Sequence, residues 1–338
     1  MPARVAARLG GWRGGKLVVE LIQYPASPLG STLAAAPGAS LLEFDPATEH
    51  WSRIPLPPPF DRADSAIASD GASVALLAND SVIVIDVDGE RHVLRPDGDP
   101  AVSSSWGLLG LAPRPQGGYV VRGLDRLYNI KPDPWRLEDV RIPPRYVVVA
   151  PTNDPDMLVL APDADRLQPA GLDDPYRLTI WAPQIPVLAR LQTHPRTWRV
   201  DPSATGLVYA RTLRGWVLLD SVVETGAMEQ PVPVPRVAGG DRQFQSLSRH
   251  GRLVSIACAG GNVRLPDLRG GCTVAVSAGD PAVLVDEMGG ESIYGVAWSP
   301  DDRLAVLAGP DEPAAAVSLR LVVESEKGAP IVAELPDG

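Results

Sequence analysis

Short apolar runs separated by polar turns make up most of the chain. The clearest example lies near the C-terminus, where the apolar residues 294–298 are followed by a polar turn, residues 299–303, and by a second apolar run, residues 304–307. Pro300 presets φ for a turn, and the side chain of Asp301 can bond to its own backbone. This pattern predicts a strand–turn–strand hairpin.

The same hairpin recurs along the whole chain at intervals of roughly 40–50 residues. The earlier copies of its turn lie at residues 10–15, 69–73, 113–118, 151–156, 201–206 and 248–251. A third apolar run and a short fourth run follow each hairpin, as at residues 81–85 and 92–94. Each unit therefore predicts four antiparallel strands. Helical repeats are disfavoured because the sequence has no helix-period pattern of useful length.

Four antiparallel strands in a unit of this length form the blade of a β-propeller. We therefore expect an all-β fold, a seven-bladed β-propeller of four-stranded antiparallel blades. Six or eight blades, or two β-sandwich domains, are the alternatives. Residues 1–338 are expected to form one propeller domain. Its blades are predicted at residues 1–60, 61–103, 104–144, 145–195, 196–239, 240–289 and 290–338.

The first and last blades decide how the ring closes. The innermost strand of the first blade is expected at residues 3–9, before a turn at residues 10–15. In the last blade the third strand is expected at residues 317–323 and the fourth at residues 331–335. This fourth strand is expected to belong to the last blade itself, so the sequence gives no sign of a strand borrowed from the other end of the chain.

The units resemble the blades of WD-repeat and TolB-like propellers. The segment Gly-Val-Ala-Trp-Ser-Pro-Asp-Asp-Arg-Leu-Ala at residues 295–305 matches that repeat best, and residues 44–51 look like a kelch unit. The Trp-Asp dipeptide that ends a WD blade is absent from the sequence, so no single member of the family is indicated. The resemblance implies that the loops joining second and third strands share one face with the loops between blades.

These second-to-third connections differ greatly in length. Three are short, at residues 78–80, 123–125 and 211–215, and four are long, at residues 25–39, 162–175, 259–271 and 309–316. Extra loop length in a compact fold is usually functional, so we expect the binding site on this loop-rich face, with drift of exposed loops as the alternative. The candidate binding residues are Asp163, Asp165, Arg166, Asp173, Asp174, Arg264, Asp267 and Arg269.

The connection at residues 162–175 is rich in carboxylates. Calcium takes several oxygen ligands, and the Asp-x-Asp spacing of Asp163 and Asp165 supplies two of them. A glycine at the sixth position and a closing glutamate are missing, so this is not a helix–loop–helix calcium loop. We expect a solvated acidic loop, with calcium as the alternative, and no other metal or cofactor.

Cys258 and Cys272 are the only cysteines. Alternation along the two runs places Val254 opposite Val276 and Cys258 opposite Cys272, so the two thiols could meet across a hairpin. A disulfide would pin the loop between them, and two buried free cysteines are the alternative. A disulfide would favour an extracytoplasmic setting, whereas the lack of a signal peptide in the first residues favours the cytoplasm.

Composition and motifs narrow the function classes. The net charge of −10 argues against nucleic acid as a partner, and no apolar run is long enough to span a membrane. His50, His92 and His194 lie at or beside predicted fourth strands and His250 lies in a first turn, so none is expected to face a central channel. No catalytic sequence motif is present, and no catalytic residue is assigned.

The expected function is therefore a non-catalytic scaffold that binds protein partners through its loop-rich face, as a subunit of a larger assembly. The alternative is a glycan- or small-ligand-binding propeller, or a propeller enzyme, with its site at the central channel. Apolar innermost strands disfavour that alternative, because residues 66–68, 147–149 and 295–297 carry no His, Asp or Arg. A purely structural subunit is not distinguishable from a scaffold by sequence. The eight tryptophans, about one per blade, predict packing between blades, with stacking on a sugar as the alternative.

Overall fold

The computed structural model describes residues 4–24, 38–58, 60, 66–78, 81–96, 110–114, 117–122, 127–143, 146–151, 158–162, 177–182, 185–192, 198–200, 208–212, 215–218, 242–248, 252–258, 272–276, 291–310, 315–325 and 328–336. Within these ranges every regular element is a β-strand except η1 (Ala316–Ser318), a single turn of 3₁₀-helix. The expectation of an all-β chain of antiparallel sheets is confirmed.

The described strands form seven sheets, and hydrogen-bonded neighbours within each sheet follow one another along the chain. The first sheet contains β1 (Arg4–Arg13), β2 (Lys16–Tyr24), β3 (Gly38–Asp45) and β4 (His50–Ile54). The second contains β5 (Ala66–Ser69), β6 (Val74–Ala78), β7 (Ser81–Ile85) and β8 (Arg91–Leu94). The third contains β9 (Gly110–Pro113), β10 (Tyr119–Arg122), β11 (Leu127–Lys131) and β12 (Arg136–Val140).

The remaining sheets repeat this meander. The fourth contains β13 (Tyr146–Pro151), β14 (Leu158–Pro162), β15 (Arg177–Ala182) and β16 (Ile185–Gln192). The fifth contains β17 (Trp198–Val200), β18 (Val208–Thr212) and β19 (Gly215–Leu218), and the sixth contains β20 (Arg242–Leu247), β21 (Leu253–Cys258) and β22 (Cys272–Val276). The seventh contains β23 (Ser292–Trp298), β24 (Leu304–Gly309), β25 (Arg320–Val323) and β26 (Ile331–Glu334).

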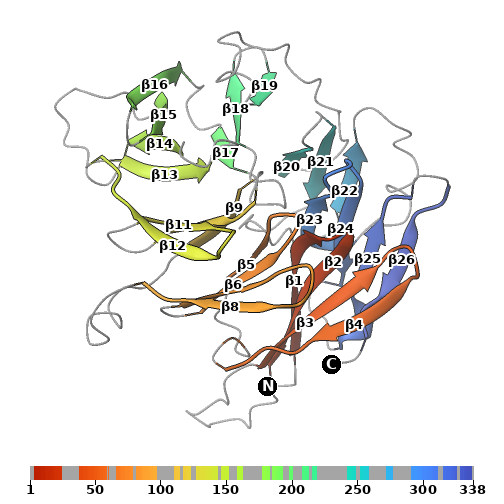
Figure 1. Cartoon of the computed structure of the whole chain (residues 1–338). Coiled ribbons are helices and arrows are strands. Elements are labelled where there is room, and N and C mark those ends of the chain that lie inside the picture. The colour runs from red at the N-terminus through yellow and green to blue at the C-terminus, as the bar shows by residue number, and fades with distance from the viewer. Residues whose placement is uncertain are drawn as a thin grey trace, which may run out of the picture.

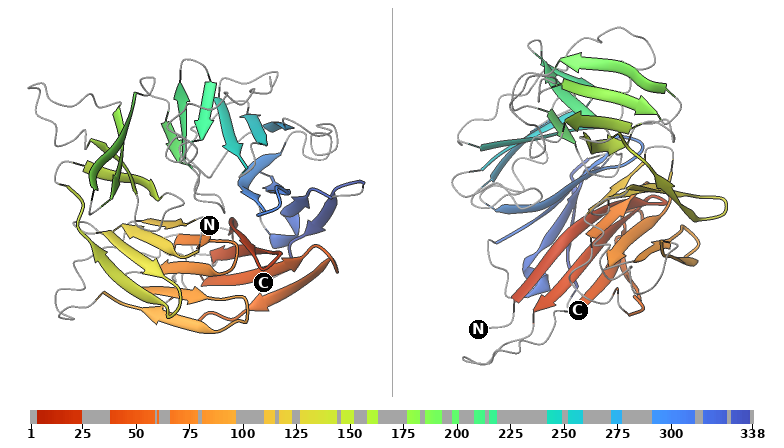
Figure 2. Two further views of the ribbon diagram at one scale, coloured as in Figure 1. Left: turned by 45° about the horizontal axis from the view of Figure 1, so that its top comes forward. Right: turned by 90° about the vertical axis from the view of Figure 1, so that its left-hand side faces the viewer.

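The sheets are arranged around a common centre, with their first strands innermost (Figure 1, Figure 2). β1 contacts β5 of the second sheet and β23 of the seventh, and β9 contacts β5 and β13. The first and seventh sheets therefore lie side by side. Each is built from its own consecutive strands, so the expectation that the last strand stays in its own sheet is confirmed.

Apolar side chains fill the space between neighbouring sheets. Along β2, Leu17 and Val19 belong to a core cluster shared with the seventh sheet, whereas Val18 belongs to a cluster shared with the second. Such a strand is buried on both faces, which explains the continuous apolar runs of the sequence. The outermost strands β8 and β26 alternate between exposed and half-buried residues instead. Trp12 and Trp298 are fully buried, as a packing role predicts.

Two expected strand boundaries are wrong. β1 extends to Arg13 rather than ending at residue 9, because a bulge between Leu9 and Gly11 lets the strand continue. Gly11 accepts the bulge with a φ of 113°, a conformation that suits glycine. The first turn therefore shrinks to two residues, Gly14 and Gly15.

The third strand of the seventh sheet begins at Arg320 rather than at residue 317. Residues 316–318 form η1 because the Ser318 hydroxyl donates to the carbonyl oxygen of Ala315 at 2.7 Å, and the Leu319 N–H donates to that of Ala316 at 2.8 Å. Leu319 itself is fully buried. Burial of the Leu319 side chain and the local hydrogen bonds outweigh the strand propensity of Val317.

Candidate functional site

All eight predicted binding residues lie outside the described part of the chain. Five fall within residues 163–176 and three within residues 259–271. The acidic loop considered for calcium falls in the first of these ranges. These assignments therefore stay predictions.

The hairpin that carries both cysteines has the predicted register. Cys258 of β21 is paired with Cys272 of β22, and Val254 is paired with Val276. Alternation of apolar residues was sufficient to find this register, because a shift by one residue would move every side chain to the other face. The disulfide itself stays a prediction.

The best-described surface is the end of the molecule where first strands turn into second strands. Because consecutive strands are antiparallel, the turns between third and fourth strands lie at the same end. We call this end the turn face, and it is opposite to the loop-rich face. Its turns are linked from one sheet to the next by hydrogen bonds and cation–π contacts.

Asp70 joins the second sheet to the third. Its Oδ1 accepts hydrogen bonds from the backbone N–H groups of Ala72 at 3.0 Å and Ser73 at 2.6 Å, which closes the turn between β5 and β6. Its Oδ2 accepts a hydrogen bond at 2.7 Å from the backbone N–H of Gly118, in the equivalent turn of the third sheet. A single carboxylate therefore shapes one turn and holds the next.

Tyr119 buries its phenol beside this turn. The hydroxyl lies 2.7 Å from the Ser73 Oγ, and the side chain is fully buried. Burial, reinforced by the charge of Asp70, raises the pKa of Tyr119 well above its usual value. The phenol is therefore neutral at physiological pH and acts as a structural hydrogen-bonding group.

The first and second sheets are joined through Ser69, Gly71 and Arg13. The Ser69 hydroxyl donates to the backbone carbonyl of Trp12, and the Gly14 N–H donates to the carbonyl of Gly71 at 2.8 Å. Arg13 Nη1 donates to the backbone carbonyl of Asp86 at 2.9 Å. The Arg13 guanidinium is also paired with Glu43, so this buried cation and buried anion satisfy one another within the first sheet.

Two arginines repeat one contact around the ring. The guanidinium of Arg252, from the sixth sheet, lies 5.5 Å from the ring centroid of Trp298 in the seventh. The guanidinium of Arg303, from the seventh sheet, lies 4.9 Å from the ring centroid of Trp12 in the first. Each arginine therefore covers the tryptophan of the next sheet with a cation–π contact.

The turns that carry these arginines share one local design. The backbone N–H of Arg252 donates to Ser248 Oγ at 2.9 Å, and that of Arg303 donates to Ser299 Oγ at 2.7 Å. Arg252 also makes a bidentate ion pair with Glu324, with both N···O distances 2.7 Å. Hydrogen bonding to Glu324 raises the pKa of Arg252 above its usual value. The sixth, seventh, first, second and third sheets are thus linked in series on the turn face.

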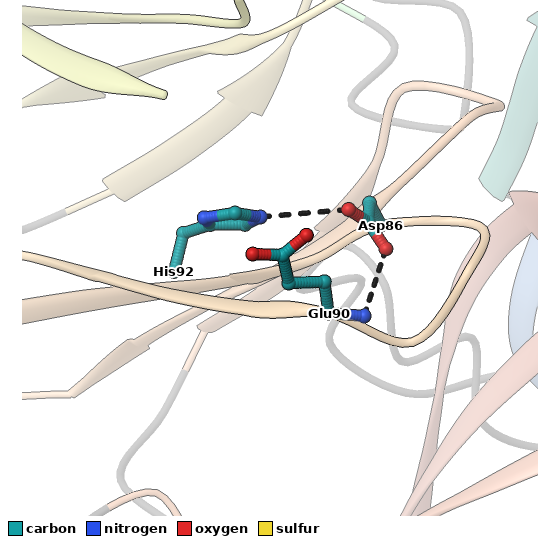
Figure 3. A group of neighbouring side chains, drawn as sticks. All are labelled: Asp86, Glu90 and His92. Carbon is teal, nitrogen blue, oxygen red and sulfur yellow. Dashed lines mark hydrogen bonds and ion pairs between the residues drawn. The ribbon is translucent and has the colours of Figure 1, made fainter. Parts of the chain in front are cut away.

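A carboxylate–histidine cluster lies in the turn between β7 and β8 (Figure 3). Asp86, Glu90 and His92 each offer one oxygen or nitrogen atom, and these three atoms lie within 4.8 Å of one another. Asp86 Oδ2 is 3.4 Å from His92 Nε2, and Asp86 Oδ1 accepts a hydrogen bond at 2.9 Å from the Glu90 backbone N–H. Among the described residues this is the group suited to hold a metal ion.

Sequence reasoning placed His92 correctly in a fourth strand but did not connect it with Asp86 and Glu90. The register of the β7–β8 hairpin is the sequence signal that could have shown that the three residues lie together. Val84 is paired with His92, so continuing the same antiparallel pairing by two residues brings Asp86 opposite Glu90. All of these side chains belong to one face of the hairpin because alternate residues of a strand point the same way.

Comparisons with known proteins bear on the fold. No family model matches the sequence, and no curated protein matches it. The acylaminoacyl peptidase of Pyrococcus horikoshii has a TM-score of 0.56 to this structure at 10% identity, over 98% of this chain and 52% of that chain. A chain of a mitotic checkpoint complex has a TM-score of 0.46 at 13% identity, over 95% of this chain and 93% of that chain. Hsv2 of Kluyveromyces lactis has a TM-score of 0.43 at 12% identity, over 98% of this chain and 99% of that chain.

At such low identity the peptidase likeness shows the fold alone, and the two weaker likenesses carry no argument. Within the described ranges, no helix has the length and apolar character needed to cross a membrane. The serial meander sheets, their arrangement around a centre and the likeness to the peptidase chain together identify a fold of the β-propeller type.

Proposed function

We propose that this chain is a non-catalytic scaffold that captures a protein partner on its loop-rich face, as a subunit of a larger assembly. In this proposal the seven described sheets are the seven blades of one ring. The observation that carries it is the network of the turn face, where side-chain and backbone groups link five neighbouring sheets to one another.

A ring that is fixed on one face can present loops on the other without losing its own order. Loops held by a rigid scaffold bind with a smaller entropic cost than loops on a mobile one. The long connections at residues 25–39, 162–175, 259–271 and 309–316 would form the binding surface, since they join second to third strands at the loop-rich face.

Tyr24 marks the base of this surface in the described part of the chain. It is the last residue of β2, directly before the long connection of the first sheet, and it is 41% exposed. Exposed tyrosines are common anchors in protein interfaces, because the ring buries a large area while its hydroxyl forms a hydrogen bond. Tyr24 is therefore the described residue that we expect to contact the partner.

The test is capture of partners from the native host, quantified by mass spectrometry, with five purified forms of the chain as bait, the parent and four variants. Three variants change the proposed binding surface: residues 163–174 are replaced by a short Gly-Ser linker, residues 260–270 are shortened, or Tyr24 is changed to alanine. Each should reduce recovery of the same partner about tenfold or more, as loss of interface anchors does. The exposed Val87 of the turn face supplies the control, and Val87→Ser should leave recovery unchanged.

Unchanged recovery with both loop variants, in chains whose thermal unfolding matches the parent, would remove the proposal. Loss of recovery with Val87→Ser alone would move the binding surface to the turn face. Recovery of no protein above the background of an unrelated bait would favour a purely structural or ligand-binding role instead.

A further inference from the structure

Three potential metal ligands lie on one face of the β7–β8 hairpin within 4.8 Å of one another, and the separation of two of them suits a small cation. Asp86 Oδ2 and His92 Nε2 are 3.4 Å apart. That distance is long for a charge-assisted hydrogen bond, which is typically about 2.7–2.9 Å. Two ligand atoms bound at about 2.0–2.1 Å in a tetrahedral zinc site are, by contrast, roughly 3.3–3.4 Å apart.

The backbone already orients the first of these ligands. The Glu90 N–H holds Asp86 Oδ1, so the second carboxylate oxygen is directed toward the imidazole (Figure 3). The Asp86 backbone carbonyl is itself held by Arg13 of the first sheet and by the Gly89 N–H at 3.1 Å. Hydrogen bonds of this kind fix ligands in metal sites and raise their affinity.

A neighbouring sheet positions the imidazole. The ring of His92 lies 6.1 Å, between centroids, from the ring of Trp135, which belongs to the third sheet. Val84 and Leu94, on the same face of the hairpin, join the apolar cluster between the second and third sheets. His92 therefore stands at the edge of a packed core, partly screened from water, while the exposed Glu90 can move to complete a ligand set.

The equivalent turn of the first sheet provides an internal comparison. It also contains an aspartate, a glutamate and a histidine, namely Asp45, Glu49 and His50. There the Asp45 Oδ1 accepts from the Ala47 N–H at 2.9 Å, and His50 follows Glu49 directly. His50 is paired there with Asp45, but Glu49 is a turn residue with a φ of 54°, and these three side chains are not gathered as those of Asp86, Glu90 and His92 are. The one-residue difference in spacing is what brings the ligands of the second sheet together.

We propose that Asp86, Glu90 and His92 form a binding site for a divalent first-row transition metal ion, with Zn²⁺ as the best fit. One imidazole nitrogen and two carboxylate oxygens suit Zn²⁺, Co²⁺ or Ni²⁺ better than Ca²⁺, which prefers a shell of six or more oxygens. The ion would fix the β7–β8 turn against Trp135 and Arg13, on the face opposite to the proposed partner surface. The site is independent of the scaffold proposal.

The test is titration of the full chain, prepared without a polyhistidine tag, with Zn²⁺ by calorimetry and with Co²⁺ by visible absorption. The parent chain should bind one ion through this site, with cobalt bands of a low-coordinate nitrogen–oxygen site. His92→Ala and Glu90→Gln should each weaken the binding about tenfold or more. His50→Ala is the matched control and should leave the affinity unchanged.

Glu90→Gln keeps the proposal falsifiable if His92→Ala perturbs the fold, because Glu90 is exposed and its backbone N–H stays in place. Equal Zn²⁺ affinity in the parent and Glu90→Gln chains would overturn the site. So would Ca²⁺ binding at the same affinity as Zn²⁺, or the absence of any Zn²⁺ binding at millimolar concentration.

Discussion

Replacing Trp12 with alanine is expected to lower the free energy of unfolding by about 3–5 kcal/mol, the usual cost of removing a fully buried tryptophan. Trp12 belongs to the core cluster that joins the first and seventh sheets, together with Leu17 and Tyr294. Removing the ring would also leave the guanidinium of Arg303 without its aromatic partner, at a further cost of about 0.5–2 kcal/mol. Urea unfolding followed by circular dichroism measures the change.

Trp12→Phe is the matched control for that experiment. The indole Nε1 of Trp12 is buried and has no hydrogen-bond partner in the described structure, so a phenylalanine ring loses area but no hydrogen bond. We expect it to recover more than half of the loss, because the face beneath Arg303 is retained. A cost below about 1 kcal/mol for Trp12→Ala would contradict the packing between the first and seventh sheets.

The second large effect is expected for Gly295→Val, which adds a side chain where β23 meets β1. A Cβ at this position would lie 2.6 Å from the Cβ of Leu9, closer than side chains approach. The backbone N and Cα of Leu9 are also near, at 3.3 and 3.5 Å, so the two backbones must move apart. We expect a loss of about 1–3 kcal/mol in the free energy of unfolding, as overpacked cores show.

A double-mutant cycle shows whether this loss arises between the two sheets. Leu9→Gly alone should destabilise the chain, because Leu9 packs against the core of the first and seventh sheets. This change removes the Cβ that the new side chain would meet, so in the Leu9→Gly, Gly295→Val double variant the two changes should compensate by about 1 kcal/mol or more. Additive losses would mean that β1 and β23 are not neighbours, and the ring would then be closed differently.

Strand content and register were predictable because they are set locally. Alternation along residues 254–258 and 272–276 was enough to pair Cys258 with Cys272. The end of β1 was not predictable, because Gly10-Gly11 and Gly14-Gly15 give the same turn signal and only the second pair forms the turn. The packing of the chain decides which glycine pair becomes a bulge.

Contacts between sheets could not be predicted from the local pattern of apolar and polar residues. The bond from the Gly118 N–H to Asp70 joins residues of two sheets and depends on how these sheets are stacked. The cluster of Asp86, Glu90 and His92 is an intermediate case. Its residues come from one hairpin, so the register alone could have revealed it, but the position of Trp135 beside His92 required the structure.

In the proposed function, the turn face holds the ring together and the loop-rich face captures the partner. Hydrogen–deuterium exchange of the purified native complex, compared with the free chain, tests it most directly. Binding should slow exchange in peptides covering residues 25–37, 163–176, 259–271 and 309–316, and should leave the turn at residues 299–303 unchanged. Protection confined to the turns at residues 69–73, 86–90 and 299–303, with no change in the long connections, would contradict it.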